Sequence, residues 1–200
     1  MSKTKLLIAT RNPGKFREYR KLLGHLPLEL TSLEEEGIEL QIGETGMSFR
    51  QNAIAKAKGY AEISGLPTLA DDSGLEVEAL GGEPGVKSAR YAGPTASDEE
   101  LIHFLLTKLG DVPWEKRKAR FRCVIALAIP QGETYLTEGH CEGIIAFTPA
   151  GKHGFGYDPI FYLPEYGLTM AQLKPEVKNH ISHRAVAARR MAELLPKILR

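Results

Sequence analysis

The sequence predicts an α/β fold, because short apolar segments typical of β-strands alternate with longer segments that have the apolar spacing of helices. The run at residues 5–10, KLLIAT, indicates a buried strand, and apolar residues recur at helical spacing over residues 16–23. The run at residues 69–77, LADDSGLEV, ends in alternating apolar and acidic residues, as a half-buried strand does. No repeat, low-complexity segment or linker interrupts this pattern, so we expect one domain.

The overall composition is that of a globular protein and gives no sign of a nucleic-acid or membrane partner. Lys and Arg number 26 and Asp and Glu number 25, so the net charge is only +1, too small to attract an anionic polymer or surface. Residues 1–9 do not resemble a signal peptide, and no apolar run approaches the roughly 18 residues of a membrane span. Cys123 and Cys141 lie in separate apolar segments without metal-binding spacing. We therefore expect a cytoplasmic protein with free, buried thiols.

A strand, a tight turn and a helix start follow one another at residues 5–15, a geometry that directs backbone N–H groups and a helix dipole towards an anion. Asn12 is a good N-cap, and Pro13 suits the first helical position. Lys15 is electrostatically unfavourable in the first turn of a helix, which makes more sense if its ammonium group reaches a phosphate. The segment matches neither the Walker A motif nor the GxGxxG motif.

The adjacent carboxylates Asp71 and Asp72 precede Ser73 and Gly74, and we expect a bend there, where an apolar segment ends. Adjacent carboxylates repel each other, and a divalent cation is one common way to keep both ionised. Mg²⁺ suits such a site because it binds one or two carboxylates together with substrate phosphates. The alternative is a loop in which Asp and Ser bond their own backbone and Gly supplies the turn. The pair alone leaves both interpretations open.

A helix is predicted to begin after Ser48, which forms a capping box with Gln51. Ser48, Asn52 and Lys56 form a polar stripe along one face of this helix, at spacing i, i+4 and i+8. A solvated face is the simpler interpretation of such a stripe. Glu44 differs, because it lies just ahead of the helix N-terminus and only one helix separates it from the acidic pair.

Two further elements are predicted beyond the acidic pair. Ser97 and Glu100 form a capping box at the start of a helix that Gly110 ends. Residues 119–147 then indicate a hairpin of two strands, whose turn lies at residues 130–132, PQG.

Residues 154–159, GFGYDP, combine two glycines with two aromatic residues in a predicted loop. Aromatic side chains in a glycine-rich loop are poor core builders, but they can present a flat face on which a nucleotide base stacks. The alternative is that Phe155 and Tyr157 pack back onto the sheet. The sequence does not decide between the two.

A C-terminal helix is predicted to begin near Ser182, with basic residues around its start. Lys178 and His180 lie just before it, and His183 and Arg184 lie in its first turn. Cations at a helix N-terminus oppose the helix dipole, so these residues suggest a bound anion or polar ligand.

Separate loops thus offer cations, carboxylates and an aromatic face, a combination that indicates a nucleotide polyphosphate site with Mg²⁺. No candidate covalent nucleophile has a base close to it in the sequence. Direct attack by water is therefore the simplest hydrolytic chemistry.

Six motifs, in the same order, resemble those of the non-canonical purine nucleoside triphosphate pyrophosphatases, the inosine triphosphatase-like enzymes that act on dITP, ITP and XTP. The motifs are TRNPGK, ETGxSFxxNAxxKA, LADDSGLxV, PGxxSARYAG, GFGYDPIF and a final K-x4-HR. Each motif alone is weak, but six in register between about residues 5 and 195 are highly specific.

The resemblance implies an elongated α/β fold with a long mixed sheet flanked by helices, in a single domain over residues 1–200 with two lobes around a central cleft. It also implies a homodimer, Mg²⁺ as cofactor, and cleavage between the α- and β-phosphates that releases the monophosphate and pyrophosphate. Such enzymes clear faulty nucleotides from the pool before they enter DNA or RNA. Neither nucleic acid nor membrane is an expected partner.

By position in the motifs, Asp72 matches the general base that activates water, and Glu44 and Asp72 match the metal ligands. The other matched positions are substrate contacts, namely Thr10, Arg11, Asn12, Pro13, Gly14, Lys15, Lys56, Ser73, Phe155, Gly156, Tyr157, Asp158, Lys178, His183 and Arg184. Phe155 matches the residue that stacks on the base. Many members have Gly in place of Arg11. Glycine permits a positive φ, whereas arginine disfavours it, so we do not expect a positive φ in this turn. The Arg11 side chain could contact a phosphate or be solvated.

Two other functions stay open on the sequence alone. One is a pyrophosphatase of the same architecture for modified pyrimidine or standard triphosphates, which a substrate profile would distinguish. Selectivity against adenine would follow if a donor such as Arg184 faced the C6 oxygen of hypoxanthine or xanthine, where adenine carries an amino group. The other function is a non-catalytic nucleotide- or RNA-binding module, against which the near-neutral charge and the carboxylates of the site count.

Overall fold

The structure, a computed structural model, describes residues 3–199 and divides the chain into two compact units. Unit 1 comprises the chain up to Asp72, the segment Cys123–Gly139 and the chain from Arg184 onwards. Unit 2 comprises Ser73–Arg122 and His140–His183. The central cleft that the resemblance implies stays a prediction.

The described residues form a seven-stranded sheet in the order β2-β1-β3-β4-β5-β6-β7. Its strands are β1 (Thr4–Ile8), β2 (Leu28–Ser32), β3 (Thr68–Val77), β4 (Lys118–Ala128), β5 (Thr134–Ile145), β6 (Phe161–Leu163) and β7 (Leu168–Thr169). β1 pairs in parallel with β2 and β3, whereas β6 pairs antiparallel with β5 and β7. The α/β class and the mixed sheet are therefore confirmed.

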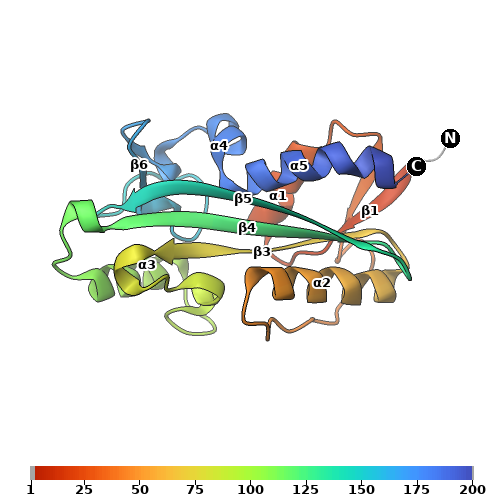
Figure 1. Ribbon diagram of the computed structural model, residues 1–200, viewed down its shortest axis with the longest axis horizontal. Coiled ribbons are helices and arrows are strands. Elements are labelled where there is room, and N and C mark those ends of the chain that lie inside the picture. Colours follow the sequence, from red (N-terminus) through yellow and green to blue (C-terminus); the bar gives the residue numbers. More distant parts are fainter. Residues whose placement is uncertain (1–2, 200) are drawn as a thin grey trace. The chain divides into compact units, whose positions relative to one another are not determined.

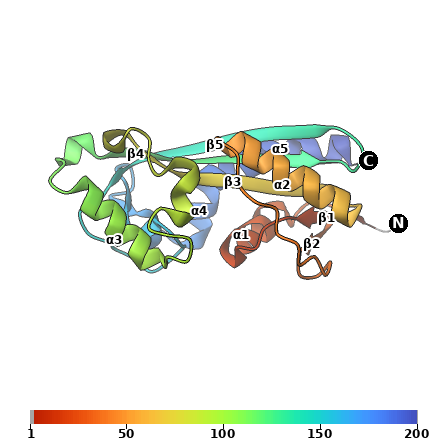
Figure 2. The same cartoon turned by 90° about the horizontal axis from the view of Figure 1, so that it is seen from below.

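In unit 1, helices cover both faces of the sheet (Figure 1). α1 (Pro13–Leu23) and α5 (His183–Ile198) pack on one face, in a core that includes residues from β1, β3 and β4. α2 (Phe49–Ser64) lies along the other face, which the view from below brings to the front (Figure 2). Because both faces of β1 are covered, its residues 6–8, LLI, are fully buried. This burial explains why the strand is a continuous apolar run.

Unit 2 contains α3 (Asp98–Leu109) and α4 (Pro175–Ile181) and has its own apolar core, to which α3 contributes Leu101. The predicted capping box of Ser97 and Glu100 is confirmed at the start of α3. Short 3₁₀ helices lie at Glu78–Leu80, Gly85–Arg90, Trp114–Lys116, Asp158–Ile160 and Met170–Gln172. Among residues 3–199, none of the helices has the length and apolar character that crossing a membrane requires.

The predicted hairpin is confirmed in the turn between β4 and β5. Ile129 N donates to the carbonyl of Glu133, and Gly132 N donates to the carbonyl of Ile129. Gln131 in this turn has φ of 56° and is the only non-glycine residue with a positive φ among those described. Arg11 therefore does not adopt a positive φ, as expected.

Two local predictions are wrong. Ser48 caps α2 by accepting from Gln51 N, but the Gln51 side chain accepts from Met47 N (2.8 Å) and so does not complete a capping box. Lys178 and His180 lie in the last turn of the separate helix α4 instead of at the N-terminus of the final helix. Cations stabilise the C-terminal end of a helix, so the position of these two residues no longer indicates a bound anion.

Arg117 is a buried cation that joins loops of unit 2. Its side chain is 1% exposed, and its guanidinium donates to the carbonyls of Ile145 (2.8 Å), Val112 (3.2 Å) and Gly110 (3.4 Å). A neutral replacement leaves these carbonyls buried without this donor, at a cost of about 1–3 kcal/mol for each unsatisfied group. We expect Arg117→Met to lower the free energy of unfolding in urea by about 3 kcal/mol.

Arg120→Met is the matched control for this prediction. Arg120 is half-exposed and pairs with Glu76 on the surface, and such pairs contribute about 1 kcal/mol or less. Equal losses of stability in the two variants would contradict the role of Arg117.

Candidate active site

The predicted groups of unit 1 gather at the carboxyl end of β1. The strand ends at Ile8, whose register partner on β3 is Leu69. Asp71 and Asp72 therefore follow on β3 just beyond the point where β1 stops. The carboxyl ends of parallel strands are the usual place for ligands in α/β sheets, because the connecting loops open there.

The turn from β1 into α1 forms as predicted. Asn12 is the N-cap of α1 and accepts from Lys15 N (3.0 Å), and Pro13 is the first helical residue. Thr10 Oγ1 accepts from Asn12 N (3.2 Å), which closes the turn, and Gly14 is buried. The start of α1 is thus an ordered helix N-terminus of the kind that binds anions.

Arg11 has a role that the sequence interpretation did not consider. Its guanidinium donates to the carbonyls of Ile38 (3.1 Å), Glu39 (2.6 Å) and Leu40 (3.1 Å). These contacts hold the irregular segment that leads to Glu44. Arg11 is therefore not simply solvated, and its contact with a phosphate stays a prediction.

Asp71 and Asp72 do not lie at a bend, and they do not share one environment. β3 continues through both residues, so their side chains point to opposite faces of the sheet. Asp71 meets Lys15 of α1, whereas Asp72 meets Asn52 of α2. Both the expected bend and the alternative of a loop are wrong, and one cation does not have to hold the two carboxylates together.

Asp71 lies in a buried cluster of charges. Its Oδ2 is 2.9 Å from Lys15 Nζ and 3.5 Å from an Arg184 nitrogen, and Arg184 also pairs with Glu18 at 2.5 Å. Burial alone would raise the pKa of Asp71, but the Lys15 ammonium and the Arg184 guanidinium outweigh it and hold that pKa well below its usual range. Asp71 therefore favours its ionised form and accepts protons poorly.

Asp72 has the opposite electrostatic character. Burial raises its pKa above the usual value, although Lys56 and a hydrogen bond from Asn52 act against the rise. Asn52 Nδ2 donates to Asp72 Oδ2 (2.8 Å), and Lys56 Nζ lies 3.8 Å from Oδ1. Of the two carboxylates, Asp72 is thus the one suited to take a proton from water.

Glu44 lies on the same side as Asp72, with Lys56 between them. Lys56 Nζ is 2.5 Å from Glu44 Oε1, and the nearby Asp71, Asp72 and Glu44 charges raise the pKa of Lys56 against the effect of its burial. The two carboxylates are hard oxygen donors of the type that Mg²⁺ binds. No group of three or more His, Cys, Asp or Glu in residues 3–199 is arranged to hold a metal ion. Two carboxylates fit the proposed Mg²⁺ because this ion commonly takes one or two carboxylates and completes its shell with water and phosphate.

Unit 2 holds the predicted aromatic loop in a fixed conformation. Asp158 is buried and accepts from Phe155 N (3.0 Å) and from Lys178 Nζ (2.6 Å). The Lys178 ammonium lies 4.8 Å from the centre of the Phe155 ring. Gly156 N donates to Asp98 at the start of α3 (2.7 Å). These contacts bring three predicted substrate contacts, Phe155, Asp158 and Lys178, into one cluster.

Other predicted contacts of unit 2 are part of its packing. Tyr157 is 3% exposed, and its hydroxyl donates to the carbonyl of Ser88 (2.9 Å), so packing onto the sheet is the correct interpretation for this aromatic. His183 is buried and stacks on Phe121, with ring centres 4.8 Å apart. Ser73, the residue after Asp72 on β3, is partly exposed.

Comparisons with known proteins agree with this architecture. Residues 6–194 match the model of the Ham1 family. The chain belongs to the Ham1 family. It is 51% identical to the dITP/XTP pyrophosphatase of Geobacter sulfurreducens, over 92% of each chain, and 48% identical to that of Geobacillus kaustophilus, over 97% of this chain and 95% of the relative. The solved structure of a HAM1 protein from Coxiella burnetii superposes with a TM-score of 0.89 at 42% identity, over 97% of this chain and 99% of that one.

In this Ham1-family chain the structure adds site residues that sequence reasoning missed. Asn52 contacts Asp72, Glu18 pairs with Arg184, and Asp98 braces the aromatic loop. Asn52 had a visible signal, since it lies in the polar stripe of α2 between Ser48 and Lys56. Nothing in the local sequence distinguishes Glu18 or Asp98 from solvated residues.

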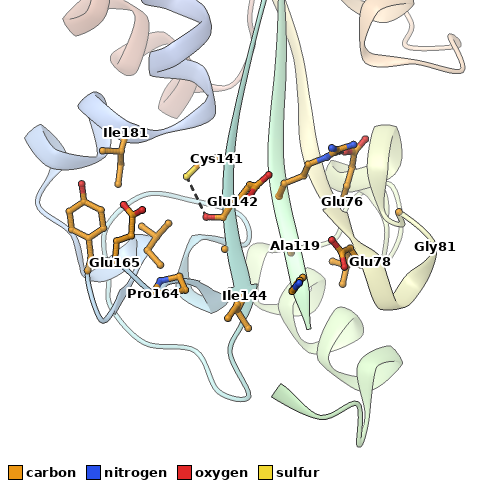
Figure 3. Close-up of a pocket in the computed structure, with 17 residues that line it drawn as sticks. Glu76, Glu78, Gly81, Ala119, Cys141, Glu142, Ile144, Pro164, Glu165 and Ile181 are labelled. Atoms are coloured by element: carbon orange, nitrogen blue, oxygen red, sulfur yellow. Dashed lines mark hydrogen bonds and ion pairs between the residues drawn. The ribbon is translucent and has the colours of Figure 1, made fainter. Parts of the chain in front are cut away.

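A groove of about 990 Å³ on unit 2 contains none of the predicted site residues. It is lined by residues from the end of β3, the start of β4 and the end of β5, and it contains Glu76 of β3, Glu78 of the 3₁₀ helix that follows β3, and Glu142 of β5 (Figure 3). Arg120 in this groove pairs with Glu76. The groove is therefore separate from the predicted site residues.

We expect Asp71→Asn to lower the free energy of unfolding at pH 7 by about 3–5 kcal/mol, because it leaves Lys15 without its buried carboxylate partner and Arg184 with Glu18 alone. The pKa of Asp71 is lower in the folded than in the unfolded protein. The contribution of Asp71 to stability is therefore complete at pH values above its pKa in the unfolded protein, about 4. This contribution is lost as the pH falls below that pKa. Urea denaturation should show a constant difference between wild type and variant from about pH 8 to pH 5 that shrinks below about pH 4.

Glu29→Gln serves as the control, because Glu29 is exposed and its ion pair with Lys5 is long, 4.0 Å. Its effect should stay below about 1 kcal/mol. A difference for Asp71→Asn that does not change with pH would contradict the assigned charge state.

Proposed function

We propose that this protein hydrolyses non-canonical purine nucleoside triphosphates (dITP, ITP and XTP) to the monophosphate and pyrophosphate, with Mg²⁺ as cofactor. The observation that carries the proposal is the environment of Asp72, a buried carboxylate with a raised pKa beside Glu44 and Lys56. In the same unit, Lys15 at the start of α1 pairs with the neighbouring Asp71, and we assign the ordered N-terminus of α1 to binding the phosphates. Relatives of similar length are named dITP/XTP pyrophosphatases, which supports the reaction class.

The chemistry requires one base and several cations. A water molecule attacks the α-phosphorus, Asp72 accepts its proton, and the bond to the β-phosphate oxygen breaks to release pyrophosphate. Mg²⁺, held by Glu44 and Asp72, would neutralise charge on the phosphates and make the attack by water easier. Lys15 and Lys56 stabilise the negative charge that develops on the leaving group. Asp71 cannot replace Asp72 as base, because two cations keep its pKa low.

Recognition of the base is assigned to the Phe155 loop of unit 2. Lys178 covers one face of the Phe155 ring, and we assign the opposite face to stacking on the purine. Arg184 is 1% exposed and pairs with Glu18 and Asp71. For Arg184 to read the C6 oxygen, its guanidinium must give up or share one of these carboxylates when the substrate binds.

The proposal has a biological consequence. Hydrolysis of these triphosphates would remove deaminated purines from the nucleotide pool before a polymerase can incorporate them. A cytoplasmic location, which the free cysteines favour, and a homodimer, which the family resemblance implies, belong to the same proposal.

The first test is pyrophosphate release from inosine, xanthosine, guanosine, adenosine and thymidine triphosphates, each with Mg²⁺ and with EDTA. We expect metal-dependent release from the inosine and xanthosine substrates, at least about 100-fold faster than from adenosine triphosphate, because a mispaired base loses buried hydrogen bonds. A flat profile across bases would favour the pyrophosphatase for standard or modified nucleotides. RNA binding without turnover would favour the non-catalytic module.

A second prediction concerns the base itself. Asp72→Asn keeps the shape of the side chain but cannot accept a proton, so kcat should fall by about 10³-fold. The Kd of a non-hydrolysable nucleotide analogue should change by less than about tenfold. The exposed Asp111→Asn is the control and should retain wild-type kinetics. Near-normal turnover by Asp72→Asn would exclude Asp72 as the general base.

A further inference from the structure

One buried amide connects the segment that carries Glu44 to the strand that carries Asp72. Asn52, in the first turn of α2, is 1% exposed. Its Oδ1 accepts from Gly46 N (2.8 Å), two residues after Glu44, and its Nδ2 donates to Asp72 Oδ2 (2.8 Å). A single side chain thus contacts both elements that bear the carboxylates.

The partners determine which way the amide points. A backbone N–H can only donate, so the oxygen of Asn52 must face Gly46, and the nitrogen must then face Asp72. The approach is close enough to exclude a side chain at residue 46, because a Cβ on Gly46 would lie 2.6 Å from Asn52 Oδ1. The glycine and the amide therefore form one matched contact.

This arrangement distinguishes the two oxygens of Asp72. Oδ2 accepts the hydrogen bond from Asn52, and Oδ1 lies 3.8 Å from Lys56 Nζ, which itself pairs with Glu44. The two oxygens therefore face different groups. Asn52 fixes this orientation, because a carboxylate that lost the contact could rotate and exchange its oxygens.

We propose that Asn52 is a positioning residue that sets the orientation of the Asp72 carboxylate and its placement relative to Glu44. The inference rests on the proposed function, because it concerns the groups to which the hydrolysis is assigned. Asn52 does not contact the substrate in this role; it acts through its two neighbours.

Packing alone does not explain an asparagine at this place. Leucine has nearly the same shape, is a better helix former and would bury without polar atoms. Only a side chain with both a donor and an acceptor can serve a backbone N–H on one side and a carboxylate on the other. The choice of residue thus follows from the two partners.

The test compares Asn52→Leu with wild type in two measurements. Steady-state kinetics with inosine triphosphate should show kcat reduced about 10- to 100-fold, the range for partners that orient metal ligands, with KM changed less than about threefold. Binding of Mn²⁺ with a non-hydrolysable nucleotide analogue, followed by the electron paramagnetic resonance signal of free Mn²⁺, should show a Kd raised about tenfold. The second measurement does not depend on turnover.

Gln51→Ala is the matched control. Gln51 is the neighbouring residue of the same helical turn, and its side-chain oxygen accepts from the next N–H of the same loop, that of Met47, at 2.8 Å. Its amide differs in making no contact with Asp72. We expect kcat and the Mn²⁺ Kd of Gln51→Ala to stay within about threefold of wild type.

Gly46→Ala provides a second route that keeps the amide. The added methyl group would meet both Asn52 Oδ1 (2.6 Å) and Gln51 Cβ (2.8 Å) and so moves the loop away from both side chains. Because Gln51→Ala reports the effect of the Gln51 contact separately, a fall in kcat and Mn²⁺ affinity in the same direction as in Asn52→Leu would be assigned to Asn52. If Asn52→Leu shows no cooperative thermal unfolding and is therefore not folded, Gly46→Ala tests the positioning role of Asn52 in its place. Wild-type kcat and Mn²⁺ affinity in the folded variants would overturn the inference, and so would an equal loss in Gln51→Ala.

Failure of the proposed function has a different signature. A wild-type protein that binds Mn²⁺ but releases pyrophosphate from no nucleotide would overturn the hydrolysis. The Mn²⁺ Kd of Asn52→Leu would then still decide whether Asn52 places the two carboxylates.

Discussion

The alternation of side chains along β3 is the constraint on which the candidate site depends. Neighbouring residues of a strand face opposite sides of the sheet, and in unit 1 the two sides are covered by different helices. Asp71 faces the cations of α1 and α5, whereas Asp72 faces the amide and lysine of α2. Two carboxylates that are adjacent in sequence therefore differ in pKa, one lowered and one raised. The strand turns one acidic pair into a carboxylate that favours its ionised form and a candidate base.

The ionised Asp71 has a second effect, on the order of the cations around it. Fixing a long charged side chain costs up to about 2 kcal/mol of rotamer entropy. If a phosphate alone fixed Lys15, this cost would reduce the free energy of nucleotide binding. Asp71 already holds Lys15 near the N-terminus of α1, and Glu44 holds Lys56. These pairs prepare the cations before a nucleotide binds, which favours binding through preorganisation.

Sequence reasoning predicted the elements well and the contacts between them poorly. The cap of Asn12, the capping box of α3 and the hairpin turn are set by neighbours within a few residues, so local patterns were sufficient. The sequence Asp-Asp-Ser-Gly is typical of turns, but pairing with neighbouring strands kept it extended, and that pairing involves residues far away in the chain. For the same reason no pattern predicted that Arg11 would hold the segment at residues 38–40 or that Glu18 would pair with Arg184.

The charges of unit 1 favour the proposed binding of a divalent cation by the carboxylates. Lys15, Lys56 and Arg184 supply three positive charges, and Glu18, Glu44, Asp71 and Asp72 supply four negative ones when all are ionised. A cluster with one excess negative charge repels a triphosphate, and burial strengthens the repulsion because the local dielectric constant is low. One bound Mg²⁺ would reverse the sign, from one excess negative charge to one excess positive charge. In the proposed reaction, the metal would thus offset the negative charge of the carboxylates that order the lysines, and it would shield Asp72 from the phosphate.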